Sequence, residues 1–155
     1  MPRKLATLCY VRHEGKTLML LRNKKEGDYH QGKWNGLGGK LEAGESPEQC
    51  MKREVLEESG LSVEDYTCRG FITFPGFDGE NDWYVWLFTI EGFSGELIDS
   101  PEGELHWIAD DKLFDLNLWE GDRVFMRWLS SEGYFSAIFR YEQGKFLDYE
   151  VEHYA

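Results

Sequence analysis

Residues 38–61, with the sequence GGKLEAGESPEQCMKREVLEESGL, carry the clearest structural and chemical signals of the chain. The terminal signals of a helix are Ser46 as N-cap, Pro47 at the first helical position, Gln49 completing a capping box, and Gly60 just beyond the last turn. The stretch therefore predicts a helix from Ser46 to Ser59.

Three glutamates on this helix are spaced to share one face. Glu54, Glu57 and Glu58 stand at i, i+3 and i+4, which places them within a sector of roughly 100°. Their carboxylates repel each other unless a cation lies between them, and carboxylate oxygen is the ligand that Mg²⁺ prefers. Arg53 can hold one glutamate by a bidentate bond, and Glu45 adds a further acid on the preceding loop. The alternative for a bare cluster of this kind is a solvated acidic face.

The complete string decides between these two interpretations. Gly39, five residues, Glu45, seven residues and then the run from Arg53 to Leu61 resemble, at every fixed position, the signature of the Nudix hydrolases. The resemblance implies an α/β/α sandwich, with a mixed β-sheet between helices. It also implies hydrolysis of a nucleoside diphosphate linked to another moiety, with Mg²⁺ or Mn²⁺ held by the helix glutamates.

The same resemblance implies a set of roles for individual residues. One glutamate, Glu54 or Glu57, would accept the proton of the attacking water, with Arg53 supporting the catalytic set. An acid on a later loop would join the metal site, with Glu102 expected and Glu104 as the second choice. The implied metal ligands are Gly38 through its carbonyl, Glu54, Glu57, Glu58 and Glu102.

The sequence just upstream points to a substrate. Residues 33–40, KWNGLGGK, resemble the oxidised-purine nucleoside triphosphate diphosphatases of the MutT type, and weaker likeness extends over nearly the whole chain. This implies conversion of a nucleotide such as 8-oxo-dGTP to the monophosphate and pyrophosphate, which sanitises the nucleotide pool and so serves DNA repair. The residues implied in substrate binding are Lys25, Tyr29, Asn35, Lys40, Trp119 and Asp122.

The chemistry of guanine fits that set, because a carboxylate such as Asp122 accepts a pair of adjacent N–H donors. The chain departs from the resemblance at Gly121, where a second acid is expected, unless Glu120 takes its place. This departure argues against activity on oxidised adenine nucleotides more than it argues against recognition of guanine. Alternatives remain for two residues: Trp119 as core packing, and Asp122 as a helix cap.

Two other functions stay open. Pro75, 15 residues after Gly60, resembles the proline of ADP-ribose-cleaving Nudix enzymes, although Gly76 also makes it a plain turn residue. A nucleotide sensor without catalysis is the remaining alternative. The intact glutamate set argues against a sensor, because binding alone needs no residues that activate water.

Composition limits the partners. The 155 residues make one expected domain, 1–155, and 17 Lys and Arg against 29 Asp and Glu give a net charge of −12. This charge disfavours nucleic acid or an acidic membrane as partner and leaves a small nucleotide, with the cation supplying the positive charge. Three unpaired cysteines and the lack of a long apolar run predict a cytoplasmic protein. Nothing in the composition indicates an oligomeric state.

Periodicity gives the remaining elements. Residues 23–40 are expected to form a long functional loop, and residues 123–131 a second helix with Phe125, Trp128 and Leu129 on its core face. Together these elements predict a mixed sheet with a helix on each face. The expected strands span residues 4–12, 16–22, 70–74, 83–91, 104–109, 134–141 and 145–149.

Overall fold

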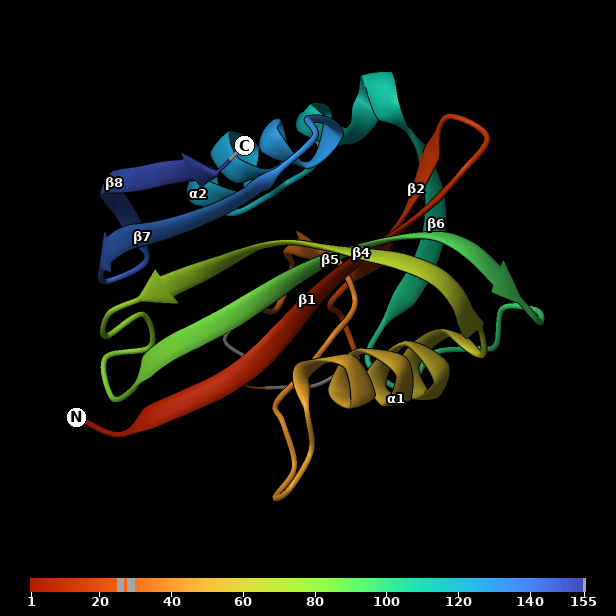
Figure 1. Ribbon diagram of the computed structural model, residues 1–155, viewed down its shortest axis with the longest axis horizontal. Helices are drawn as coiled ribbons and strands as arrows, with labels where there is room; N and C mark the ends of the chain where they lie inside the picture. Colours follow the sequence, from red (N-terminus) through yellow and green to blue (C-terminus); the bar gives the residue numbers. More distant parts are fainter. Residues whose placement is uncertain (25–26, 28–29, 155) are drawn as a thin grey trace.

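The computed structural model describes residues 1–24, 27 and 30–154, so the predicted pocket residues Lys25 and Tyr29 lie outside the described residues. A mixed sheet forms the centre of the molecule, with α1 on one face and α2 toward the other (Figure 1). The elements are β1 (Arg3–His13), β2 (Lys16–Leu21), β3 (Trp34–Asn35), α1 (Pro47–Ser59), β4 (Ser62–Phe74), β5 (Asp82–Ser94), β6 (Glu104–Ala109), α2 (Glu120–Phe125), β7 (Tyr134–Glu142) and β8 (Lys145–Tyr154). Two 3₁₀ helices span Asp110–Asp115 and Trp128–Ser130.

The sheet combines both kinds of strand pairing. Its strand order is β3-β2-β1-β5-β4-β7-β8, and β6 also pairs with β2. β1 runs parallel to β5, and β4 runs parallel to β7 over residues 70–73. The remaining pairs are antiparallel. The predicted mixed sheet is confirmed, and β1 stands near its centre, where both of its faces are covered.

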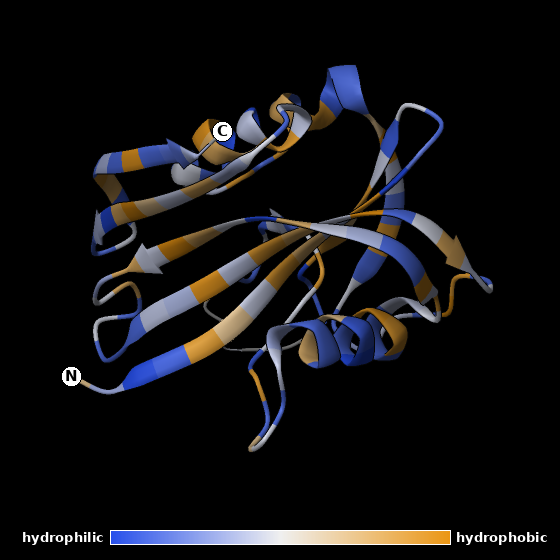
Figure 2. Ribbon diagram, in the orientation of Figure 1, coloured by the Kyte–Doolittle hydropathy of each residue, from blue (hydrophilic) through white to orange (hydrophobic). Residues whose placement is uncertain are grey.

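Two apolar cores lie on opposite faces of this sheet. Successive side chains of a strand point to opposite faces, and β1 follows this rule: Cys9 and Val11 join the core under α1, while Tyr10 joins the other core. Met51 and Val55 are the side chains that α1 buries in the first core. Apolar positions accordingly recur along the strands and in both helices (Figure 2). The predicted sandwich arises because one strand supplies alternate residues to both layers.

The first helix forms as its sequence predicts. The Ser46 side chain accepts a hydrogen bond from the Gln49 backbone N–H at 3.1 Å, and the Gln49 side chain accepts from the Ser46 backbone N–H at 2.9 Å. Gly60 ends the helix in the left-handed conformation, with φ of 83°. The helix carrying the three glutamates is therefore fixed at both ends by local contacts.

The second helix differs from its prediction. The predicted helix over residues 123–131 is wrong in its bounds: α2 begins three residues earlier, ends at Phe125, and a turn separates it from the short 3₁₀ helix. The expected core face is correct, since Phe125 and Leu129 are buried and Trp128 packs against the same core. Apolar spacing of three and four residues suits an interrupted segment as well as a continuous helix, so the spacing left the break undetected.

Strands β4 and β8 are longer than the sequence predicts. β4 extends from Ser62, well before the predicted start, and its pairing with β5 shifts register at three places, which disrupts the alternation of apolar residues. β8 continues to Tyr154 as an edge strand whose residues are mostly exposed. The long loop over residues 23–40 contains the two-residue strand β3, which pairs with β2.

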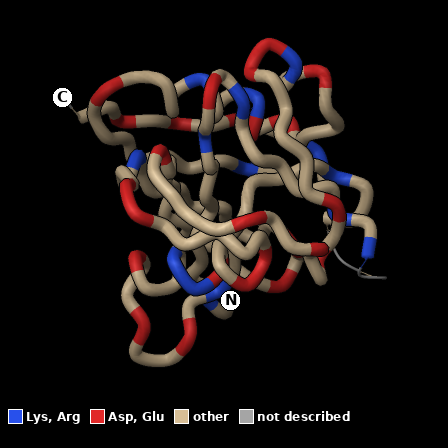
Figure 3. Tube along the Cα trace, turned by 90° about the vertical axis from the view of Figure 1, so that its right-hand side faces the viewer, with Lys and Arg blue, Asp and Glu red and all other residues tan. Residues whose placement is uncertain are grey.

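Charged residues are spread over the whole molecule (Figure 3). Acidic positions occur over most of the trace, and basic ones are interspersed among them (Figure 3). Within the described residues, no helix is both long enough and apolar enough to cross a membrane.

We predict that Ser46→Ala lowers the free energy of unfolding by about 1 kcal/mol, because the substitution removes the side-chain acceptor of the N-cap. Urea unfolding measures the effect, with the exposed Ser130→Ala as matched control. Equal stabilities of the two variants would show that this cap does not hold α1 in place.

Candidate active site

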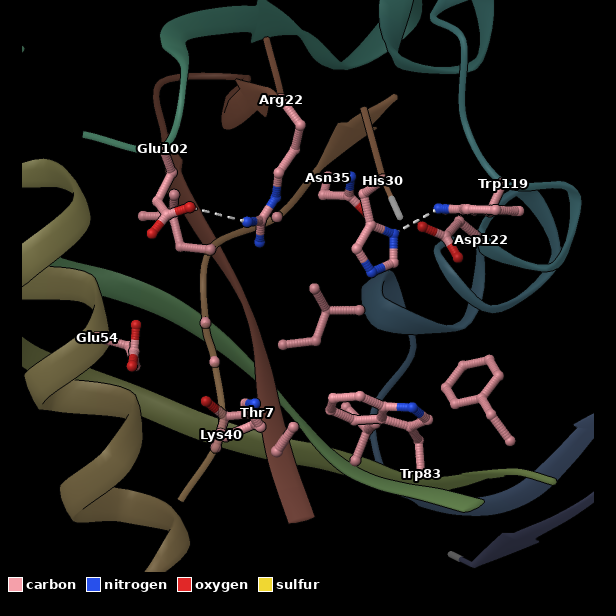
Figure 4. Close-up of a pocket in the computed structure, with 18 of the residues that line it drawn as sticks. Thr7, Arg22, His30, Asn35, Lys40, Glu54, Trp83, Glu102, Trp119 and Asp122 are labelled. Atoms are coloured by element: carbon pink, nitrogen blue, oxygen red, sulfur yellow. Dashed lines mark hydrogen bonds and ion pairs between the residues drawn. The ribbon is translucent and has the colours of Figure 1, made fainter. Parts of the chain in front are cut away.

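A cavity of about 400 Å³ lies between β1, the loop before α1, and the face of α1 that carries Glu54 and Glu58 (Figure 4). Most of the residues predicted to form the site meet here, although they come from distant parts of the sequence. The predicted residues that line the cavity are Asn35, Gly38, Lys40, Glu54, Glu58, Glu102, Trp119 and Asp122. The cavity therefore joins the glutamate helix to the residues expected to read a base.

Two glutamates of α1 face one end of the cavity. Glu58 is only 4% exposed, and its carboxylate accepts a hydrogen bond from the Gly38 backbone N–H at 3.1 Å. Burial raises the pKa of Glu58 well above its ordinary range, and the nearby Glu54 carboxylate raises it further. Gly39 allows the loop to approach this closely, because a Cβ there would lie 2.6 Å from the carboxyl carbon of Glu54. This end of the cavity therefore brings two carboxyl groups close together.

Arg53 organises the acids on the outer side of the helix. Its guanidinium donates to both carboxylate oxygens of Glu45, at 2.7 and 2.9 Å, and to Glu54 at 2.7 Å. It also lies 3.3 Å from the Glu57 carboxylate and donates to the Lys40 carbonyl at 3.1 Å. The Arg53 bonds lower the pKa of Glu45 to about 2. The predicted bidentate role of Arg53 thus falls on Glu45, and Glu54 receives a single bond.

The glutamates are not equally placed for a metal ion. Glu57 lies outside the cavity lining, and 58% of its side chain is exposed. Across the described part of the chain, no three acidic, histidine or cysteine side chains stand together as a complete ligand set. The donors that suit a hard cation at the cavity wall are the carboxylates of Glu54 and Glu58 and the backbone of Gly38.

The two candidate loop acids, Glu102 and Glu104, differ in their position relative to the cavity. Glu102 lines the cavity and forms an ion pair with Arg22 at 3.3 Å. Glu104 lies outside the lining, where it contacts Asn23 and His106. Of these two acids, Glu102 is therefore the one that faces the cavity shared with Glu54 and Glu58.

The other end of the cavity is aromatic and holds one buried acid. Asp122 is 6% exposed, and burial raises its pKa to about 7, although Lys33 and Arg123 act in the opposite direction. Asn35 is 7% exposed, and its Nδ2 has no hydrogen-bond partner among the described residues. Trp119 packs within the core, as one of its two interpretations expects, and it also lines the cavity.

The structure explains the missing second acid. A Cβ at Gly121 would lie 2.6 Å from the Tyr141 hydroxyl oxygen, which accepts the Gly121 backbone N–H at 2.6 Å. A larger residue at Gly121 therefore requires Tyr141 to move. Glu120 does not replace it, because its side chain is 67% exposed and pairs with Arg123 at 3.4 Å. The cap alternative for Asp122 is wrong, since α2 has no side-chain cap and Asp122 lies inside its first turn.

Sequence reasoning missed several residues of the lining. His30 accepts a hydrogen bond from Trp119 Nε1 at 2.8 Å and lies nearly parallel to Phe77 at 5.9 Å between ring centroids. Trp83 donates through Nε1 to Asp78 at 3.0 Å (Figure 4 shows Trp83 across the cavity from Trp119). Burial alone would raise the pKa of Asp78. Hydrogen bonds from the side chains of Asn81 and Trp83 and from the Glu80 backbone N–H outweigh this effect and lower the pKa to about 2. His30 and Asp78 lie in loop and turn segments and Trp83 lies at the start of β5, and only the fold brings the three together.

Comparisons with known proteins agree with this geometry. The NUDIX domain family matches residues 2–129. The chain is 38% identical to the oxidized purine nucleoside triphosphate hydrolase of Danio rerio over 97% of this chain and 92% of that protein. It is 34% identical to the Mus musculus protein of the same name, over 86% and 85% of the two chains. It also resembles the crystal structure of a mutator MutT protein from Bacillus halodurans, with a TM-score of 0.85, 30% identity, and coverage of 96% and 97%. On these grounds, the chain belongs to the NUDIX domain family.

Proposed function

We propose that the protein hydrolyses an oxidised purine nucleoside triphosphate, such as 8-oxo-dGTP, to the monophosphate and pyrophosphate. The observation that carries this proposal is the joining of two kinds of chemistry in one cavity. Glu54 and Glu58 stand on the wall near α1, while Asn35 and Asp122 stand near the aromatic end. The names of the Danio and Mus relatives support the same substrate class.

The acidic end is suited to a cation that accompanies the triphosphate. Glu54, Glu58 and the Gly38 carbonyl would hold Mg²⁺ or Mn²⁺, with Glu102 as a further ligand from the cavity lining. Glu57 would join them only after its exposed side chain turned toward the cavity. When bound, the cation neutralises charge on the phosphates and lowers the pKa of water. Without a cation, burial and the neighbouring Glu54 raise the pKa of Glu58, so that Glu58 holds a proton in place of the missing positive charge. A bound cation would displace this proton and let both carboxylates act as ligands.

The proton of the attacking water needs an acceptor on the cavity wall. Glu54 fits this role better than Glu57, because Glu54 lines the cavity while Glu57 faces outward. The bond from Arg53 to Glu54, 2.7 Å long, orients the carboxylate toward the cavity wall. Arg53 therefore acts as a positioning residue that keeps the base ready to accept a proton.

The opposite end offers complementary groups to guanine. An ionised Asp122 accepts two adjacent N–H donors of the base, and the amide of Asn35 supplies both a donor and an acceptor. Base binding also relieves the cost of burying these groups, since Asn35 Nδ2 has no protein partner in the described structure. Trp119 forms one aromatic wall of the base site.

The ADP-ribose alternative has less structural support. Pro75 begins the turn between β4 and β5 and does not line the cavity, so it acts as the plain turn residue. The sensor alternative leaves the arrangement of Glu54, Arg53 and Glu45 without a purpose. The proposal is therefore an enzyme acting on a small nucleotide.

We predict that hydrolysis requires a divalent cation and that Glu54→Gln lowers kcat by roughly 100-fold or more, because the variant loses a ligand and a proton acceptor. Pyrophosphate release, with and without a chelator, measures both effects. Glu48→Gln, an exposed position on the same helix, is the matched control and should retain full activity. Full turnover in excess chelator, or an active Glu54→Gln variant, contradicts the metal site.

We predict that kcat/KM is higher for 8-oxo-dGTP than for dGTP or ADP-ribose, and that Asp122→Ala removes the preference between the first two. Loss of a charge-assisted hydrogen bond costs on the order of 1.5–3 kcal/mol, which corresponds to roughly a 10- to 150-fold fall in kcat/KM for 8-oxo-dGTP. Steady-state kinetics on the three substrates decides the question. A preference for ADP-ribose, or unchanged selectivity in the variant, moves the proposal away from oxidised purines.

We predict that the buried Asp122 makes the metal-free protein less stable as pH rises. Its pKa is about 7 in the folded protein against an ordinary 3.8, so the unfolded chain loses the proton first and the free energy of unfolding falls between these values. Asp122→Asn removes this contribution, which amounts to roughly 1–4 kcal/mol at pH 7.5. Urea unfolding at pH 4 and 7.5 measures it, with the exposed Asp111→Asn as control. Parallel pH profiles of all three proteins contradict the assignment.

A further inference from the structure

The turn between β4 and β5 carries a carboxylate whose hydrogen-bonding capacity is used within the protein. Asp78 Oδ1 accepts from the backbone N–H groups of Glu80 at 2.9 Å and Asn81 at 2.7 Å. Asp78 Oδ2 accepts from Asn81 Nδ2 at 2.7 Å and from Trp83 Nε1 at 3.0 Å. An ionised carboxylate offers about four lone-pair sites, so these bonds account for its acceptor capacity although Asp78 lines the cavity. Asp78 is therefore suited to holding its neighbours in place and not to reading a base.

Trp83 is held by this carboxylate at one edge of its ring. An indole has a single N–H donor and no acceptor, and the donor of Trp83 is engaged by Asp78. Trp83 is partly buried, because it packs against the core and also lines the cavity. Unlike Trp119 and Phe77, which contact each other at 4.9 Å between ring centroids, the Trp83 ring contacts no other aromatic ring of the described residues. What Trp83 can offer to a ligand is therefore the face of its ring.

The fold places this ring in the cavity that contains the expected base-reading residues. Trp83 and Val85 are two residues apart on β5, so their side chains point to the same side of the sheet, and both line the cavity. In Figure 4, Trp83 lies across the cavity from Trp119. A planar base that enters this end of the cavity can stack on Trp83, since every base has a π-face.

We propose that Trp83 is a stacking wall of the base site and that Asp78 is the positioning residue that fixes the orientation of its ring. This inference rests on the proposed function and adds two residues to it. Since the Trp83 donor is engaged by Asp78, the ring contributes affinity for any purine and does not distinguish one base edge from another. The choice of base then depends on Asn35 and Asp122, which present polar groups to the same cavity.

Stacking and edge recognition have different kinetic signatures. Loss of stacking raises KM for 8-oxo-dGTP and for dGTP by the same factor and leaves the ratio of the two values unchanged. Loss of a polar contact to the base edge, as in Asp122→Ala, changes that ratio. The glutamates of α1 are untouched in either case, so kcat should hardly respond.

The test uses three substitutions that separate the stacking role from the positioning role. Trp83→Ala removes the ring, and Trp83→Phe retains a ring face without the donor. Asp78→Asn is nearly isosteric: the amide oxygen can keep the two backbone bonds, but the NH₂ group then meets the Trp83 donor with another donor. Asp82→Asn is the matched control. Asp82 accepts the Gly76 backbone N–H at 2.8 Å at the end of the same turn, an amide oxygen retains that bond, and Asp82 lies outside the cavity lining.

Steady-state kinetics and NMR give the expected results. Trp83→Ala should raise KM for both nucleotides roughly 5- to 150-fold, which is the range for loss of base–aromatic stacking. Trp83→Phe should recover most of this loss. Asp78→Asn should raise both KM values roughly 3- to 10-fold and shift the Nε1–H resonance of Trp83, which is assigned by its disappearance in Trp83→Phe. Asp82→Asn should change neither the KM values nor the resonance.

Nucleotide binding gives a readout that needs no hydrolysis. Addition of dGMP to the unsubstituted protein should shift the Trp83 resonance, because a stacked base adds its ring current. Inorganic pyrophosphate, which lacks a base, should leave the resonance in place.

Each other outcome overturns a defined part. Unchanged KM values in Trp83→Ala refute the stacking wall, as does a Trp83→Phe variant that is no better than Trp83→Ala. A changed ratio between the nucleotides in Trp83→Ala refutes contact through the ring face alone. Unchanged KM values in Asp78→Asn refute the positioning role. Should Trp83→Ala fail to fold, Asp78→Asn and the dGMP titration decide the same points.

Failure of this inference and failure of the proposed function are distinguishable. If the protein hydrolyses 8-oxo-dGTP but dGMP leaves the Trp83 resonance unmoved, the stacking wall is refuted and the proposed function stands. If no triphosphate is hydrolysed but dGMP still shifts the resonance, the proposed function is refuted and the stacking wall stands.

Discussion

The buried carboxylate of Glu58, beside Glu54 and bonded to the Gly38 N–H, is the contact on which the architecture of the site depends. A carboxylate removed from water is costly unless hydrogen bonds or a cation compensate it. The loop must therefore pass close to α1, which the absence of a side chain at Gly39 permits. Burial beside Glu54 raises the pKa of Glu58, so a proton compensates this carboxylate; in the proposed function a divalent cation would take the place of that proton.

The sheet links this acidic wall to the aromatic end of the cavity. β1 contributes Cys9 and Val11 to the core under α1 and Tyr10 to the opposite core, so both layers are fixed to one strand. The cavity runs alongside that strand, from Glu58 on α1 to Asp122 at the start of α2. A triphosphate and its base differ in the chemistry they need, and this arrangement supplies acidic groups at one end and aromatic groups with one buried acid at the other.

The sequence was most informative where the relevant contacts are local. The α1 helix, its cap at Ser46 and its glutamate face follow from neighbouring residues, and each was predicted. The early start of β4 was missed, because register shifts interrupt its alternation. His30 and its bond to Trp119 were missed for a different reason, since 89 residues separate the two partners and no periodicity connects them. Resemblance suggested Asn35 and Asp122, but only the fold places them in one cavity with Glu54.

The central claim is that one cavity binds the cation at the glutamate end and the purine at the aromatic end. Crystals grown with Mn²⁺ and a non-hydrolysable analogue of 8-oxo-dGTP test it directly, because anomalous scattering locates the manganese independently of the protein atoms. We predict an anomalous peak within coordination distance of the Glu54 and Glu58 carboxylates, with the base held between Asn35, Asp122 and Trp119. Manganese bound away from α1, or a base lying outside the aromatic end of the cavity, would contradict the account.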